Sequence, residues 1–113
     1  TVGHFQQGRL AGFATFKRDR RSKAVHKSYI HTMYVSPEQR GKKVAQGLLS
    51  FIIDFARKSS GLEQIHLWVL NPRTSTARRL YIKAGWEPQG LLVKDDLVIN
   101  GAYVDAEYLI LRL

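Results

Sequence analysis

The chain is predicted to fold as an α/β (α+β) domain, a mixed and mostly antiparallel central sheet with helices on its faces. The first observation is the order of its periodic segments: three strand-like runs, a helical run, a strand, a second helix and two strands. The second is size: 113 residues, 44% of them hydrophobic, are enough to bury a core. The third is the lack of cysteine, which excludes a disulfide framework. We therefore expect one domain over residues 1–113.

Three strands are expected in the first third of the chain. Residues 2–5 and 10–16 flank a short turn that contains Gly8, and residues 28–35 are rich in Tyr, Ile, Thr and Val. Residues 17–23 carry a run of charge, for which a nucleic-acid patch and a solvated hairpin loop are both possible. The loop is favoured, because no aromatic residue is interleaved for base stacking.

A helix is expected after the third strand, which a proline ends. Apolar side chains recur there at helical spacing, and the width of their stripe suits a helix packed on a sheet. The main stripe is Val44, Leu48, Phe51, Ile52 and Phe55, widened by Ala45, Leu49 and Ile53. The sequence Ser-Ser-Gly at residues 59–61 predicts a left-handed cap.

The second half predicts a strand, a helix and a hairpin. Residues 65–70 are almost continuously apolar, which is typical of a strand covered on both faces. Thr74 or Ser75 can cap the next helix. Its shared face consists of Ala77, Leu80, Tyr81 and Ala84, before Gly85 closes it. Strands at 91–99 and 102–113 flank Asn100-Gly101, which predicts a type I′ turn.

Residues 33–49 place a strand end, a proline, a charged turn and a helix start in direct succession. The first amides of a helix lack intrahelical partners and its dipole adds partial positive charge, so such an end attracts anions. Three basic side chains add charge and one glycine permits a tight turn: Arg40, Lys42, Lys43 and Gly41. The segment is neither a Walker loop nor a dinucleotide fingerprint. It predicts a phosphate site.

A second stretch, residues 67–86, resembles the second signature of the GNAT superfamily of N-acetyltransferases. The family has a Leu-x-Val strand, an Asn-x-x-Ala helix start and then Leu-Tyr-x-x-x-Gly-aromatic. The matching residues are Leu67, Val69, Ala77, Leu80, Tyr81, Gly85 and Trp86. Residues 33–49 resemble the family's coenzyme A loop, Gln/Arg-x-x-Gly-x-Gly/Ala after a Val-x-Pro strand end. The matches there are Val35, Pro37, Arg40, Ala45, Leu48 and Leu49.

The resemblance runs from about residue 10 to residue 113, with the family's first strand and first two helices largely absent. It implies the GNAT-like acyl-CoA N-acyltransferase fold. Lys43 stands where the loop normally has its first Gly, and Thr74 where the helix start normally has Asn. One extra residue separates Val69 from Ala77. These departures weaken the transfer of individual contacts more than the family assignment.

The resemblance implies acetyl-CoA as cosubstrate and transfer of its acetyl group to a primary amine of a small molecule or protein, by direct attack on the thioester. A strand amide near Met33 or Tyr34 would stabilise the oxyanion, and Tyr81 would protonate the leaving thiolate. The Thr74 hydroxyl would bond to the cofactor or cap the helix. The implied cofactor-binding residues are Met33, Tyr34, Val35, Arg40, Gly41, Lys42, Lys43, Val44, Ala45, Thr74 and Tyr81.

The general base is left open. No Asp or Glu stands on the strand after the first helix, where Trp68 or His66 occupies the place that some branches of the family give to a carboxylate. His31 and His66 lie on strands that are able to line an acceptor site, although a structural role is favoured for both. The four histidines lack metal-ligand spacing, and no metal is expected. Asp95 and Asp96 either attract a cationic amine or form a solvated turn, and the turn is favoured.

The net charge of +9 leaves two alternatives open. One is a basic nucleic-acid-binding module, which is disfavoured because zinc, stacking and helix-turn-helix signatures are missing. The other is a coenzyme A-binding domain of the same fold without catalysis. No apolar run approaches the ~20 residues of a membrane span, and no signal peptide is visible. We expect a cytoplasmic protein, with a homodimer as a possible assembly.

Overall fold

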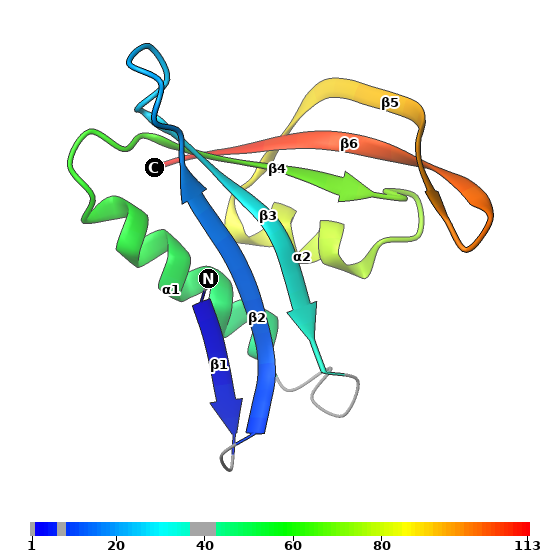
Figure 1. Ribbon diagram of the computed structural model, residues 1–113, viewed down its shortest axis with the longest axis horizontal. Helices are drawn as coiled ribbons and strands as arrows, with labels where there is room; N and C mark the ends of the chain where they lie inside the picture. The colour runs from blue at the N-terminus through cyan, green and yellow to red at the C-terminus, as the bar shows by residue number, and fades with distance from the viewer. Residues whose placement is uncertain (1, 7–8, 37–42) are drawn as a thin grey trace. The chain divides into compact units, whose positions relative to one another are not determined.

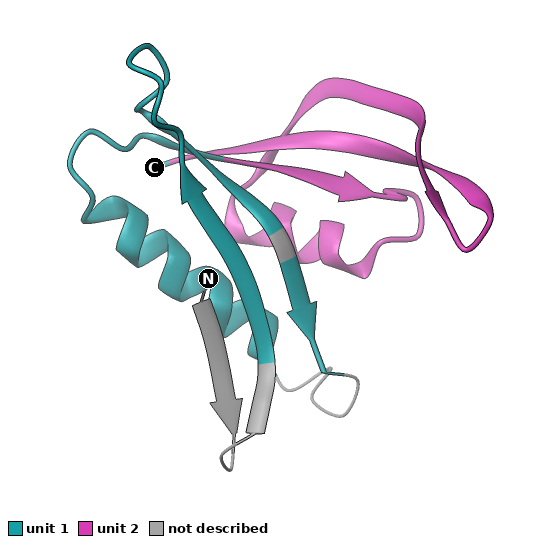
Figure 2. Cartoon of the chain, viewed as in Figure 1, with its two compact units in different colours: residues 1–65, 113 teal, residues 66–112 magenta. Residues whose placement is uncertain are grey.

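The computed structural model describes the backbone of residues 2–6, 9–36 and 43–113, and the side chains of residues 12–31, 33–36 and 43–113. These residues form six strands and two helices in the predicted sequence order (Figure 1). The strands follow the hydrogen-bonded order β1-β2-β3-β4-β6-β5, and the prediction of a mixed sheet with two helices is confirmed. The chain divides into two compact units, residues 1–65 with 113 and residues 66–112 (Figure 2).

Unit 1 is an antiparallel three-stranded sheet with one helix packed on it. The elements are β1 (Val2–Gln6), β2 (Arg9–Arg18), β3 (Lys27–Val35) and α1 (Val44–Arg57). In Figure 1, α1 lies across one face of these strands. Gly12 is required where they meet, because a Cβ there would lie 2.7 Å from the Tyr34 carbonyl oxygen and 3.0 Å from Val44 Cγ1.

The buried row of α1 differs in part from the predicted stripe. The buried side chains are Val44, Leu48, Leu49, Ile52 and Ala56. Phe51 and Phe55 are each 55% exposed, so their assignment to the core is wrong. The buried row advances four residues at a time and ends on Ala56, which leaves both phenylalanines at its margin. Phe55 instead meets Phe16 edge to face, at a centroid distance of 6.0 Å.

The end of α1 also differs from the prediction. The C-cap is Lys58, in a right-handed conformation, and the helix therefore closes before the Ser-Ser-Gly segment. Gly61 has φ +77°, but it belongs to the following turn, in which the Leu62 amide donates to the Ser59 carbonyl oxygen at 3.2 Å. The left-handed residue is present, three positions beyond the cap.

Unit 2 contains most of β4 (Gln64–Leu70), together with α2 (Thr76–Ala84), β5 (Glu87–Ile99) and β6 (Ala102–Arg112). On α2, Tyr81 is buried, whereas Ala77 is exposed and Leu80 and Ala84 are half-buried. The α2 helix is tied to β6 by Arg78, whose Nε donates to Glu107 Oε1 at 2.6 Å. Asn100 and Gly101 both have positive φ, 52° and 77°, which confirms the type I′ hairpin.

Two strand predictions in unit 2 need correction. β5 begins at Glu87, four residues before the predicted start, because Glu87 and Pro88 already pair with β6 ahead of a register shift. On β4, Trp68 and Leu70 are exposed, whereas His66 two residues before Trp68 is buried. One face of β4 is therefore open at Trp68 and Leu70, and the expectation that both faces are covered is wrong at these two residues.

Candidate active site

The N-terminus of α1 has the form of an anion-binding helix end. The helix begins at Val44, and the Gly47 amide donates to the Lys43 carbonyl oxygen at 3.0 Å. The amides of Val44, Ala45 and Gln46 precede this bond, so the helix offers them no acceptor. The predicted site residues Arg40, Gly41 and Lys42 lie outside the described residues.

Lys43 caps α1 in a left-handed conformation. Its φ is 62° and ψ 21°, its side chain is exposed, and it makes no side-chain cap hydrogen bond. Left-handed backbone is the region that glycine enters without steric cost. The sequence comparison with the family expects Gly at this position, so the backbone adopts a glycine-like conformation although the residue is Lys.

The end of β3 lies directly against this helix start. The side chains of Met33 and Val35 are partly buried and pack on the buried pair Val44 and Leu48. Tyr34 points the other way, is 43% exposed, and has its ring 5.5 Å from that of Phe13. Two predicted cofactor residues of β3, Met33 and Val35, and one of α1, Val44, are thus brought together inside unit 1.

A β-bulge precedes this segment of β3. Thr32 pairs with Thr15 and Ile30 with Phe16, so His31 is the extra residue. A bulged residue is left out of the regular ladder and bends its strand. The sequence predictions missed this bulge, because the β-branched and aromatic pattern of β3 runs through it without a Gly or Pro signal.

Tyr81 is the predicted proton donor and lies on α2. Its side chain is buried, and its ring meets that of Trp86 at a centroid distance of 5.7 Å. Burial raises the pKa of the Tyr81 phenol above its ordinary value of 10.0. At neutral pH the hydroxyl therefore keeps its proton, as a donor requires.

Thr74 lies in the turn before α2. Ser75 is the N-cap: its hydroxyl oxygen accepts a hydrogen bond from the Arg78 amide at 3.1 Å. The alternatives for the cap are thereby resolved in favour of Ser75, and Thr74 is exposed with its amide bonded to the Asn71 carbonyl oxygen. Both residues line a cavity of about 260 Å³, shared with Pro72, Arg73, Thr76, Arg78 and Arg79. Three arginines give this cavity a positive wall.

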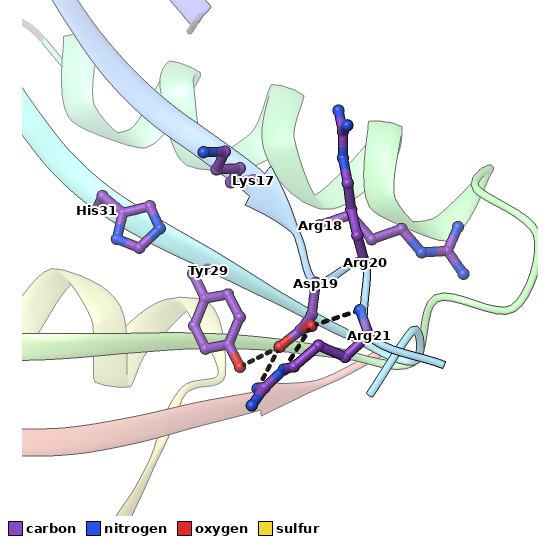
Figure 3. A pocket seen from close by; sticks show the side chains of 7 residues that line it. All are labelled: Lys17, Arg18, Asp19, Arg20, Arg21, Tyr29 and His31. Atoms are coloured by element: carbon purple, nitrogen blue, oxygen red, sulfur yellow. Dashed lines mark hydrogen bonds and ion pairs between the residues drawn. The ribbon is translucent and has the colours of Figure 1, made fainter. Parts of the chain in front are cut away.

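A second cavity, of about 540 Å³, lies at the far end of β3 from Val35 (Figure 3). Its lining residues are Lys17, Arg18, Asp19, Arg20, Arg21, Tyr29 and His31. The Asp19 carboxylate receives hydrogen bonds from Arg21 and Tyr29, and these hold the pKa of Asp19 well below its usual value. The register places Lys17 opposite Tyr29, and the His31 ring is stacked on that of Tyr29. The charged hairpin therefore has two aromatic rings beside it, which the sequence predictions missed.

The described residues contain no group of three or more His, Asp or Glu side chains placed to hold a metal ion. His66 is buried and bonded to the Tyr108 hydroxyl, whereas His31 is exposed and stacked on Tyr29. In the same part of the chain, neither helix is long and apolar enough to cross a membrane.

Comparison with known proteins identifies the family. Residues 1–86 match the family model described as Acetyltransferase (GNAT) family. The chain belongs to the GNAT acetyltransferase family. The match contains the β3–α1 junction and Tyr81, so the resemblance read from the two motifs is confirmed.

One curated relative of this GNAT chain is spermidine N(1)-acetyltransferase of Vibrio cholerae serotype O1. It is 32% identical over 85 residues, which are 74% of this chain and 47% of the relative. The chain therefore spans about half the length of that enzyme.

Solved structures share the fold at lower identity. A GNAT acetyltransferase from Streptococcus pneumoniae superposes with a TM-score of 0.87 at 22% identity, covering 96% of this chain and 64% of that one. Ribosomal-protein-alanine N-acetyltransferase from Brucella melitensis gives 0.84 at 20% identity, covering 98% and 67%. The Salmonella typhimurium protein yncA, solved with its cofactor acetyl-CoA, gives 0.83 at 23% identity, covering 96% and 61%.

Proposed function

We propose that this GNAT chain transfers an acetyl group from acetyl-CoA to a primary amine of a small molecule or protein. Family membership carries the proposal, because the matched region holds both motif segments. The relative from Vibrio cholerae is named for acetyl transfer to spermidine, and the yncA structure contains acetyl-CoA. Each of these names describes the relative, and we extend the shared chemistry to this chain.

The donor is proposed to bind at the β3–α1 junction of unit 1. The amides of Val44 and Ala45, which have no acceptor within the helix, and the charge of Lys43 suit a pyrophosphate. Met33, Tyr34 and Val35 supply strand backbone for the pantetheine arm. Arg40, Gly41 and Lys42 are included from the motif alone. In the turn before α2, Thr74 lines the arginine-lined cavity, which supports a contact with the anionic cofactor.

The reaction is proposed to proceed by direct attack. The neutral amine attacks the thioester carbonyl carbon, an N–C bond forms, and the C–S bond breaks with the electron pair leaving on sulfur. A backbone amide near Met33 or Tyr34 would stabilise the oxyanion, a contribution of about 3 kcal/mol per donor. Tyr81, which is protonated at neutral pH, would give its proton to the thiolate.

The proposal has further parts. Residues 1–113 act as one N-acetyltransferase domain, the reaction uses no metal, and the protein works in the cytoplasm. Nucleic acid is not the partner, and a homodimer is the assembly to look for by sedimentation. The competing function is coenzyme A binding without catalysis. It draws support from two departures from the family motifs, Lys43 in place of Gly and Thr74 in place of Asn.

Two measurements test the proposal. Acetyl-CoA is titrated calorimetrically into the protein and into Arg40→Glu, with Arg57→Glu in the last turn of α1 as the control for added negative charge. We expect binding that is lost in Arg40→Glu and kept in Arg57→Glu. Thiol release from acetyl-CoA is then followed with spermidine and with an N-terminal alanyl peptide, and the cysteine-free chain gives no background. Binding without thiol release would support the inactive domain, and absence of binding would overturn both.

A further inference from the structure

The charged hairpin between β2 and β3 borders a cavity that the proposed function does not use. Its volume is about 540 Å³, within the range of about 300–1,000 Å³ that is common for ligand sites (Figure 3). The lining residues, 17–21, 29 and 31, all belong to unit 1. Tyr29 and Val35 lie six positions apart on β3, about 20 Å of extended strand, so this cavity and the proposed pyrophosphate site are at opposite ends of that strand.

The charge of the lining residues favours an anion. The only carboxylate among them is that of Asp19, whereas four of them are basic: Lys17, Arg18, Arg20 and Arg21. Lys17 and Arg20 are exposed, and their side chains make no hydrogen bond or ion pair with any residue that the structure describes. These two cations are therefore available to a ligand.

Arg21 is held at the cavity by Asp19. The Asp19 carboxylate accepts hydrogen bonds from Arg21 Nε at 3.0 Å and from Arg21 Nη2 at 2.7 Å, and a third from the Arg21 amide at 3.0 Å. These bonds hold the pKa of Asp19 well below its usual value, so the ion pair is present at neutral pH.

The same ion pair leaves donors for a ligand. A guanidinium has five N–H groups, and Asp19 takes one from Nε and one from Nη2. The Arg21 side chain is 76% exposed, so the other donors are open to solvent. A guanidinium fixed in this way presents planar donors to phosphate oxygens with little further loss of side-chain freedom.

Two stacked rings line the cavity beside these charges. The ring centroids of Tyr29 and His31 are 5.8 Å apart, with an angle of 23° between the ring planes. The Tyr29 hydroxyl donates to Asp19 Oδ2 at 3.0 Å, so one carboxylate holds both the phenol and Arg21 (Figure 3). His31 is exposed, and its ring brings the stack to the surface. A planar ring of a ligand is able to extend such a stack.

We propose that this cavity binds a nucleoside monophosphate. The base stacks on the His31 ring and the phosphate bonds to Arg21, while Lys17 and Arg20 add positive charge. Cations alone would suit any anion, and rings alone would suit any planar molecule, but a mononucleotide carries both groups on one small scaffold. Binding of this kind requires no acetyl transfer, so the inference goes beyond the proposed function.

Three probe molecules test the two parts of the ligand on the unaltered protein. AMP, adenosine and ribose 5-phosphate are each titrated calorimetrically, without acetyl-CoA and with acetyl-CoA at saturation. AMP should bind at least about tenfold more tightly than either of its parts, and its affinity should fall as salt rises. The Kd of AMP should agree within about twofold with and without acetyl-CoA, because the two sites lie at opposite ends of β3.

Variants separate the ring from the charge. His31→Ala should weaken AMP binding at least about fivefold and leave ribose 5-phosphate unaffected, because only base stacking is lost. Arg21→Gln should weaken AMP and ribose 5-phosphate about tenfold and leave adenosine unaffected. If Arg21→Gln lowers the thermal midpoint through loss of the partner of Asp19, Lys17→Gln replaces it, since that side chain makes no bond to the described residues. Lys17→Gln should weaken both phosphates about threefold at low salt.

The controls come from the same hairpin. His26→Ala removes an imidazole and Lys23→Gln removes a positive charge, each at a position that does not line the cavity. Neither should change the Kd of AMP by more than about twofold. Every variant is checked for an unchanged thermal midpoint before its affinity is compared.

Four results would overturn the inference. The first is the absence of AMP binding, and the second is loss of AMP binding at saturating acetyl-CoA, which would place AMP in the donor site. The third is a set of His31 and Arg21 variants that bind AMP as their controls do. The fourth is a short single-stranded RNA that binds over about tenfold more tightly than AMP with a steeper salt dependence, which would indicate a nucleic-acid surface. If AMP binds and acetyl-CoA does not, the proposed acetyl transfer fails and this inference stands.

Discussion

The left-handed cap of α1 gives a stability prediction that can be worked from the structure. Lys43 has φ 62°, and an L-residue with a Cβ there is strained by about 1–2 kcal/mol. Lys43→Gly removes that strain, whereas the greater freedom of Gly in the unfolded chain costs about 0.5–1 kcal/mol. Gly is also a better N-cap than a long side chain that makes no cap bond. We expect a net gain of about 1 kcal/mol, or roughly 4 °C in the thermal midpoint.

Lys43→Ala is the matched control, because it removes the same charge and the same long side chain but keeps the Cβ. The two variants are compared by thermal and urea unfolding. The gain should appear in Lys43→Gly alone, whereas both variants should weaken acetyl-CoA binding by the same small factor, about two- to threefold at low salt. A Gly variant no more stable than the Ala variant would refute the reasoning from the backbone conformation.

Three further predictions concern other described contacts. Ser75→Ala should destabilise the protein by about 1 kcal/mol through loss of the α2 cap, whereas Ser50→Ala, exposed within α1, should not. The pKa of Asp19 is lowered, so the contribution of its carboxylate to stability is present above the ordinary pKa of 3.8 and is lost as pH falls below it. The urea midpoint of Asp19→Asn should therefore differ most from that of the parent near pH 7 and least near pH 2. The pKa of Tyr81 is raised, so the stability of the protein should decline as pH rises beyond 10.0, and Tyr81→Phe should lessen that decline. The kcat of Tyr81→Phe at pH 7 should be lower than that of the parent by about tenfold or more.

The parts of the fold that were predictable rest on local chemistry. Asn100-Gly101 determines its own turn, since both residues adopt positive φ readily and the flanking runs pair on either side. The start and end of α2 follow in the same way from Ser75 and Gly85. Such signals act within a few residues, so a single sequence is enough to read them.

The parts that were missed depend on partners distant in the chain. The bulge at His31 exists only in the pairing of β3 with β2, and the link between His66 and Tyr108 spans 42 residues. Phe51 and Phe55 continue the apolar spacing of α1 perfectly well, yet the sheet beneath the helix is covered by the row that ends on Ala56. Periodicity shows that a helix has an apolar side, but the width of the surface it meets decides which apolar residues are buried.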